Sequence, residues 1–132
     1  MKRGRLKSAI LLTLITNLHA KRHNSLPNFY EDPRSQTVED MSSVALTCRA
    51  NGIPKPKITW QKRNSKTGNW QVLDNKYVDG TAMVFEGDLD FIAVSKGGRR
   101  GEYSDDGEYR CLAKNIMGEV ESQPARLTVA CK

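Results

Sequence analysis

The stretch Asp105-Asp106-Gly107-Glu108-Tyr109-Arg110-Cys111 decides the fold. Its acidic residues and glycine are typical of a turn, and a tyrosine two residues before a cysteine suits a hydroxyl that bonds to upstream backbone. Cys48 and Trp60 lie earlier in the chain. Two sheets packed face to face are about 10 Å apart, a gap that a Cys48–Cys111 disulfide can cross with an indole beside it. Such a bridge closes a loop of about 60 residues, which the chain-entropy model values at about 4 kcal/mol.

Short alternating segments surround these positions, and turn residues separate them at intervals of roughly ten residues. No segment of helical length carries an i, i+3, i+4 apolar stripe. The pattern predicts an all-β, immunoglobulin-like two-sheet sandwich with Greek-key connections and a core around Leu46, Trp60 and Tyr109. The expected strands are 28–32 and 35–38 (split by Pro33), 43–50, 57–62, 70–73, 81–85, 88–94, 107–115 and 119–129.

The first twenty residues have the layout of a secretory signal peptide: a basic start, an apolar stretch from Ala9 to Ile15, and a small residue, Ala20, at the cleavage point. We expect a flexible segment at 21–27, the domain at 28–130 and a tail at 131–132, which holds the third cysteine, Cys131. The formal charge is +6, but residues 21–132 carry 17 Lys and Arg against 15 Asp and Glu. Most of the basicity belongs to the leader, which argues against a nucleic-acid partner.

Catalysis, metals and cofactors are not expected. Both histidines precede the predicted domain, so it has no histidine to act as a base, and it has no phosphate-cradling glycine loop. The acidic clusters 86–90 and 102–106 lack the spacing of a calcium loop, and acidic residues at turns are commonly just solvated. The sequence therefore predicts that the chain is not an enzyme.

The chain resembles I-set immunoglobulin domains and, more narrowly, the first such domain of the roundabout (Robo) axon-guidance receptors. The resemblance runs from about Pro27 to Ala130. It rests on the segments 30–33 (YEDP), 44–48 (VALTC), 52–60 (GIPKPKITW), 87–91 (GDLDF), 106–115 (DGEYRCLAKN), 117–119 (MGE) and 125–130 (ARLTVA), and on the basic loop 96–100 (KGGRR).

This resemblance implies a protein-binding surface on one sheet, where roundabout receptors bind the leucine-rich-repeat ligand Slit. The matched positions are Glu31, Thr47, Arg49, Ala82 and Ile92. Strand parity turns Thr47, Arg49 and Ile92 outward, and we expect Ile92 beside Arg49 as an apolar spot with a charged rim. A single exposed isoleucine without function is the open alternative.

The basic loop with Lys96, Arg99 and Arg100 is the second candidate site. Arginine forks suit bidentate contacts with sulfate-like oxyanions, and the resemblance implies heparan sulfate as the ligand. An ordinary solvated loop is the alternative, because Glu102, Asp105 and Asp106 follow closely.

The sequence thus predicts a secreted or cell-surface recognition domain of roundabout type that binds a Slit-like ligand and heparan sulfate. Two alternatives remain open. One is an adhesion domain that binds itself or another immunoglobulin protein, and the other is a secreted single-domain decoy.

Overall fold

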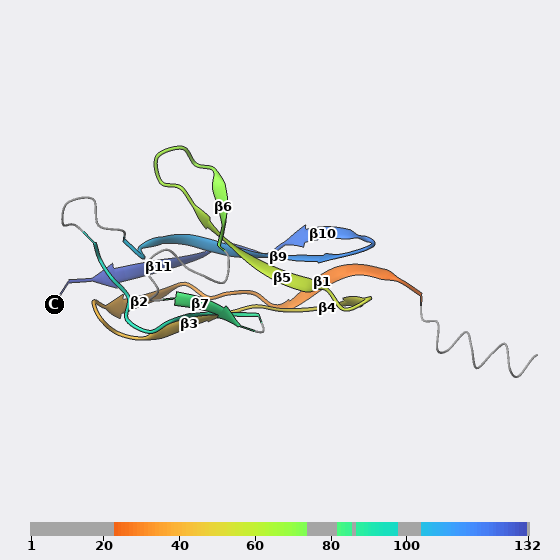
Figure 1. The fold of residues 1–132 in the computed structure, drawn as a ribbon, viewed down its shortest axis with the longest axis horizontal. Helices are drawn as coiled ribbons and strands as arrows, with labels where there is room; N and C mark the ends of the chain where they lie inside the picture. The colour runs from red at the N-terminus through yellow and green to blue at the C-terminus, as the bar shows by residue number, and fades with distance from the viewer. Residues whose placement is uncertain (1–22, 74–81, 86, 98–103, 132) are drawn as a thin grey trace, which may run out of the picture.

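Two layers of β-strands make up the protein (Figure 1). The computed structural model describes residues 23–73, 82–85, 87–97 and 104–131. The first layer contains β1 (Ser25–Glu31), β3 (Val44–Thr47), β4 (Arg49–Ile53), β7 (Ala82–Phe85) and β8 (Asp88–Phe91). The second contains β2 (Gln36–Glu39), β5 (Lys57–Arg63), β6 (Trp70–Leu73), β9 (Gly107–Asn115), β10 (Gly118–Glu121) and β11 (Ala125–Ala130). The predicted all-β sandwich is confirmed.

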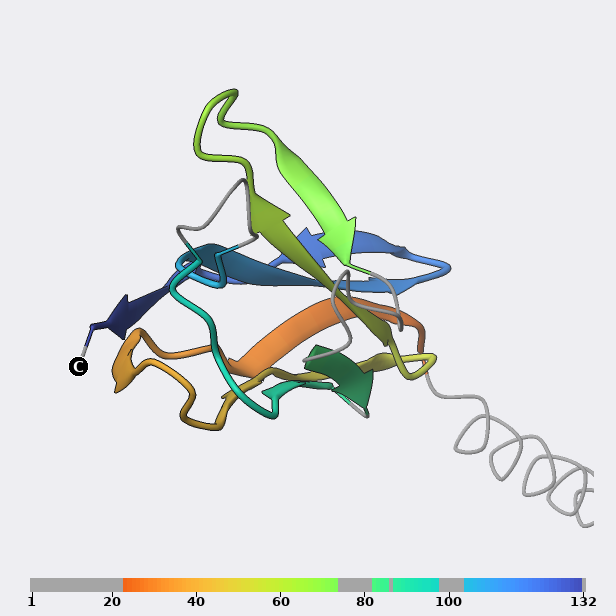
Figure 2. The ribbon, with the colours of Figure 1, turned by 60° about the vertical axis from the view of Figure 1, so that its left-hand side comes forward.

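The strands pair in a different order in each layer. In the first layer β1 pairs with β4, and β3–β8–β7 form a three-stranded sheet. In the second layer the order is β2–β11–β9–β5–β6, with β10 also on β9, and β2 runs parallel to β11. The β5–β6 hairpin stands out from the rest of the sandwich (Figure 2). The described chain starts at one end of the long axis and finishes at the other (Figure 1).

Two predicted strands are divided, the first where its pairing partner changes and the second where its register on β9 shifts by one residue. The segment 43–50 becomes β3, which pairs with β8, and β4, which pairs with β1, with only Cys48 between them. The segment 119–129 becomes β10 and β11, separated at Ser122–Pro124. The backbone N–H of Ser122 donates to the carbonyl of Cys111 (2.8 Å), and its Oγ accepts from the N–H of Cys111 (2.9 Å). These hydrogen bonds keep Ser122, the first residue after β10, attached to β9.

The segment 21–27, expected to be flexible, contains the start of β1 at Ser25. The Ser25 hydroxyl accepts a hydrogen bond from the N–H of Ile53 (3.1 Å), and its carbonyl accepts one from the amide of Asn115 (2.8 Å). These two contacts tie the first described residues to both layers. The prediction for Ser25, Leu26 and Pro27 is therefore wrong. The predicted signal peptide, 1–20, lies outside the described residues.

Gly87 allows the turn before β8 to approach β4. Its φ is +90°, a conformation that favours glycine, and a Cβ there would meet the carbonyl oxygen of Cys48 at 2.8 Å. The same close approach lets the Gly87 carbonyl accept a hydrogen bond from the N–H of Cys48 (3.1 Å). The turn thus connects β8 to the residue that carries the disulfide.

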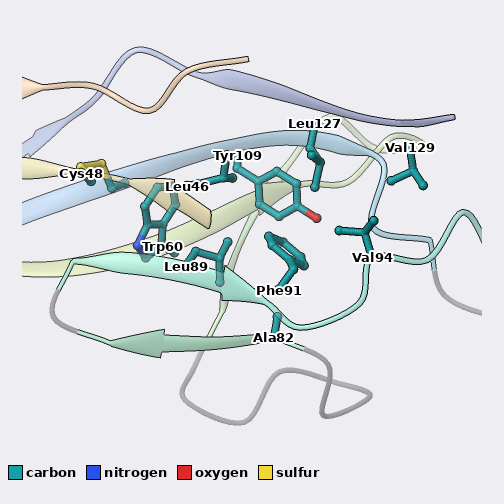
Figure 3. Close-up of a cluster of buried hydrophobic side chains, with 11 residues drawn as sticks. Leu46, Cys48, Trp60, Ala82, Leu89, Phe91, Val94, Tyr109, Leu127 and Val129 are labelled. Atoms are coloured by element: carbon teal, nitrogen blue, oxygen red, sulfur yellow. A yellow bond between two sulfur atoms is a disulfide. The ribbon is translucent and has the colours of Figure 1, made fainter. Parts of the chain in front are cut away.

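The core lies between the layers and extends from the disulfide at one end to Val94 and Val129 at the other (Figure 3). Cys48 is bonded to Cys111 across 63 residues, with their Cα atoms 6.6 Å apart. Trp60 is fully buried beside the bridge, in register with Cys111 on the neighbouring strand. Phe91 meets Tyr109 edge-to-face, with ring centroids 5.7 Å apart. The predicted bridge and its tryptophan are confirmed.

Tyr109 fixes the turn that leads into β9. It is fully buried, and its hydroxyl donates to the carbonyl of Asp105 at 2.7 Å. The Asp105 carboxylate accepts from the N–H of Ser95 (2.8 Å), and the Asp106 carboxylate accepts from the N–H of Val129 (2.7 Å). The two acidic residues are therefore structural, in contrast to the solvated turn expected from the sequence.

Replacing Tyr109 with phenylalanine should lower the free energy of unfolding by about 1–3 kcal/mol, because the buried Asp105 carbonyl loses its hydroxyl partner. Urea denaturation followed by tryptophan fluorescence measures the change. Tyr30→Phe is the control, since Tyr30 is 62% exposed and should lose nothing. Equal stabilities for the two variants would contradict the role given to Tyr109.

Candidate protein-binding surfaces

The predicted ligand site on the first layer contains a cation between two acidic residues. Glu31 on β1 is in register with Arg49 on β4. The Arg49 guanidinium contacts the Asp88 carboxylate at 2.9 Å, and this hydrogen bond raises the pKa of Arg49 above its usual value. Thr47 is half-buried and lies opposite Asp88. Three of the predicted residues are thus brought together, with their charge largely balanced.

The other two predicted ligand residues do not join them. Ala82 is only 4% exposed and packs in the core opposite Phe91, so its prediction as a surface residue is wrong. Ile92 is 66% exposed, as its parity predicts. It follows the end of β8, however, four residues beyond Asp88, and a strand rises about 3.3 Å per residue. The expected contact between Ile92 and Arg49 is wrong, because about 13 Å of strand separates their levels.

The basic loop is described only at its start. The Lys96 ammonium contacts the Asp106 carboxylate at 2.7 Å, and this hydrogen bond raises the pKa of Lys96. Its backbone N–H donates to the carboxylate of Asp40 (3.0 Å). Arg99 and Arg100 lie outside the described residues. The one described cation of the predicted heparan sulfate site is therefore already paired with a carboxylate.

A surface that the sequence did not reveal lies on the outward side of the second layer. Trp70 on β6 is half-buried between two arginines: the guanidinium carbon of Arg110 is 4.3 Å from a ring centroid, and that of Arg63 is 6.0 Å away. Arg110 also donates from Nε to the amide oxygen of Gln61 (2.8 Å). Val72, two residues along β6, is 63% exposed on the same side. We call this surface the Trp70 face.

Ion pairs hold the arginines of the Trp70 face in place. Arg63 contacts Glu108 at 3.0 Å, and Arg110 contacts Glu121 at 3.3 Å. Because each arginine is anchored by a carboxylate while it touches the ring, the indole has a defined orientation. Tryptophan and arginine are also the residues that most often dominate protein interfaces.

An open hollow of about 830 Å³ borders this face. Its walls combine four cations with two carboxylates from three strands and two loops. They include Lys62, Arg63, Lys66, Asp106, Glu108 and Arg126. The hollow is therefore mixed in charge, with cations in excess.

The signal for Trp70 was present in the sequence, because Trp70 and Val72 share one parity in a short strand. Parity alone does not say which side faces out. The register does so: Leu73 is opposite the inward Trp60, so Trp70 is opposite the outward Arg63. The length of the hairpin between β5 and β6 sets that register, and the sequence left it undetermined.

The described residues contain neither a metal-binding cluster nor a membrane-spanning helix. Within them, no three His, Cys, Asp or Glu side chains are grouped so that they could hold a metal ion. The same part of the chain contains no helix of the length and apolarity that crossing a membrane requires.

Comparison with known proteins identifies the fold. Residues 27–129 match the model of the immunoglobulin I-set domain. The chain is 34% identical to human protogenin over 125 residues, which is 95% of this chain and 10% of that protein. It is 32% identical to receptor-type tyrosine-protein phosphatase F of Danio rerio over 120 residues, 91% of this chain and 6% of that protein. The chain thus spans a tenth or less of these relatives' length.

Solved structures agree. The tandem Ig repeats of Dlar match with a TM-score of 0.65 and 26% identity, over 86% of this chain and 53% of that one. Immunoglobulin domains 1–5 of Sidekick-1 match with a TM-score of 0.65 and 29% identity, over 83% and 21%. These comparisons establish the I-set fold without singling out its roundabout branch. With its interlayer disulfide, buried tryptophan and tyrosine corner, the chain belongs to the immunoglobulin I-set domain family.

Proposed function

We propose that the chain is an extracellular recognition domain of adhesion type, which binds a protein partner through the Trp70 face. The observation that carries this proposal is an indole held between Arg63 and Arg110 on an outward sheet surface. A rigid aromatic side chain loses little conformational freedom on binding, and its arginine neighbours can also contact a partner. A structural disulfide is in keeping with an oxidising, extracellular location.

The Trp70 face fits a protein better than a small molecule. Its apolar centre, Trp70 and Val72, is surrounded by charged and polar groups, which is the composition of a protein interface. Among the relatives, a receptor-type tyrosine-protein phosphatase matches 91% of this chain. This relationship supports a role in recognition at the cell surface.

Trp70→Ala should abolish binding of the domain to cells while leaving the fold intact, since Trp70 lies outside the buried core. The domain, biotinylated and tetramerised on streptavidin, is added to a panel of intact cells, and flow cytometry measures binding before and after trypsin treatment. Tyr30→Ala is the matched control, because Tyr30 is an exposed aromatic on the opposite layer. Trypsin-sensitive binding that Trp70→Ala leaves unchanged would refute the Trp70 face as the site.

The roundabout resemblance supports a second candidate, a Slit-like ligand bound to the first layer. The specific support is the cluster of Glu31, Thr47 and Arg49, in which the Arg49 side chain remains 36% exposed beside Asp88. Ile92 would form a separate apolar contact further along the layer.

Arg49→Glu and Ile92→Asp should each weaken binding to an immobilised Slit leucine-rich-repeat domain by at least about tenfold, because one reverses a contacting charge and the other buries a carboxylate. Surface plasmon resonance measures the affinity. Lys55→Glu, an exposed charge reversal at the turn between β4 and β5, should have no effect. Affinities unchanged by both variants would exclude a Slit-like ligand at this site.

Heparan sulfate is the ligand we propose for the basic loop. Lys62 and Lys66 line the hollow together with Ser104, which closely follows Arg99 and Arg100 in the chain. Cations from the loop and from the hollow could therefore contact one sulfated chain.

Arg99→Ala/Arg100→Ala should elute from a heparin column at a lower salt concentration than the unaltered chain, because fewer cations are left to contact sulfate groups. Arg34→Ala/Lys55→Ala, which removes two exposed charges elsewhere, controls for net charge. Equal elution of the double variant and the unaltered chain would rule out this loop as the heparin site.

A further inference from the structure

A row of four side chains crosses the Trp70 face at one end of its strands. Trp70 on β6 is in register with Arg63 on β5, and Glu108 on β9 is in register with Arg126 on β11. The 3.0 Å ion pair between Arg63 and Glu108 joins the two halves. From β6 to β11 the row therefore reads aromatic, cation, anion, cation.

We propose that this row binds the same row of a second copy of the chain, across a two-fold axis that runs parallel to the strands between β5 and β9. The inference rests on the proposed function and names the partner of the Trp70 face. In a two-fold interface each contact occurs twice, with the two residues exchanged. The row is self-complementary, because the two-fold rotation places each side chain opposite a side chain that it attracts.

The expected contacts follow from reversing the row. Arg63 meets Glu108 of the second copy, and Glu108 meets Arg63 of the second copy, so the two internal ion pairs merge into one network of four charges. These side chains remain 49% and 32% exposed in a single copy, so they are accessible to a partner. Trp70 meets Arg126 of the second copy in a cation–π contact.

The hollow provides room for the incoming indole. Arg63, Glu108 and Arg126 all line it, so Trp70 of the second copy, placed against Arg126, reaches a concave site and not a flat one. Tryptophan is among the residues that most often form binding hot spots. Arg110, stacked on Trp70 at 4.3 Å, orients the ring before binding.

The same axis predicts where the contact ends. Lys57 and Lys114 are in register at the far end of β5 and β9. The two-fold rotation places Lys57 against Lys114 of the second copy, and Lys114 against Lys57 of the second copy. Two cations repel there, so the two sheets should diverge toward that end. The interface is thus confined to the Trp70 end.

Charge reversals test the arrangement in the secreted chain, with Cys131→Ser in every protein because the exposed free cysteine could form disulfide-linked dimers. Sedimentation velocity measures the dimer dissociation constant. Arg63→Glu and Glu108→Arg should each weaken dimerisation by at least about tenfold, because each sets like charges together. An equimolar mixture of the two should dimerise again, since every altered residue then meets an opposite charge.

Two further variants sharpen the test. Lys114→Glu should tighten the dimer, because it places a carboxylate against Lys57 of the second copy, and Lys55→Glu should leave dimerisation unchanged. A chain that stays monomeric up to about 1 mM would overturn the proposal. So would single reversals that weaken the dimer without recovery in the mixture. If Trp70 is still required for binding to cells, either result refutes the second copy as partner and leaves the proposed function standing.

Discussion

The disulfide between Cys48 and Cys111 is the constraint on which the other features depend. It joins β9 to the junction of β3 and β4, so it sets both the spacing of the layers and which residues of the neighbouring strands point inward. Because Cys111 is in register with Trp60, the inward side of β5 is determined as well. Side chains alternate along a strand, and the outward side of the second layer follows from that choice. The Trp70 face is therefore a consequence of the core.

The two tryptophans of the chain lie in different surroundings and have different roles. Trp60 is fully buried between the layers and fills the space beside the bridge. Trp70 lies on the outer surface, with one arginine stacked on its ring and a second near its edge. The same apolar ring stabilises the fold in one place and remains available to a partner in the other, where charges hold it in position without covering it.

The sequence predicted what depends on spacing and alternation: the bridge, Trp60, the hydroxyl bond of Tyr109 and the bounds of β9. It did not predict what depends on register between strands. Ala82 was assigned to the ligand site through the resemblance, and nothing in the sequence showed that β7 aligns it with the inward Phe91. Trp70 was overlooked for the same reason, since the β5–β6 hairpin decides which side it faces. The break at Cys48 arises from a change of pairing partner, and the break at Ser122 from a one-residue shift of register on β9; local patterns record neither.

In the proposed dimer the surface tryptophan meets a second copy of the chain while the core tryptophan stays insulated, and the indole N–H signals of the two residues report on this separately. Two-dimensional nitrogen–proton NMR spectra of the Cys131→Ser chain, recorded over a dilution series, measure both at once. The Trp70 indole signal is expected to shift as the concentration rises, whereas the Trp60 signal stays in place. A fixed Trp70 signal, or equal movement of both, would contradict the proposed dimer.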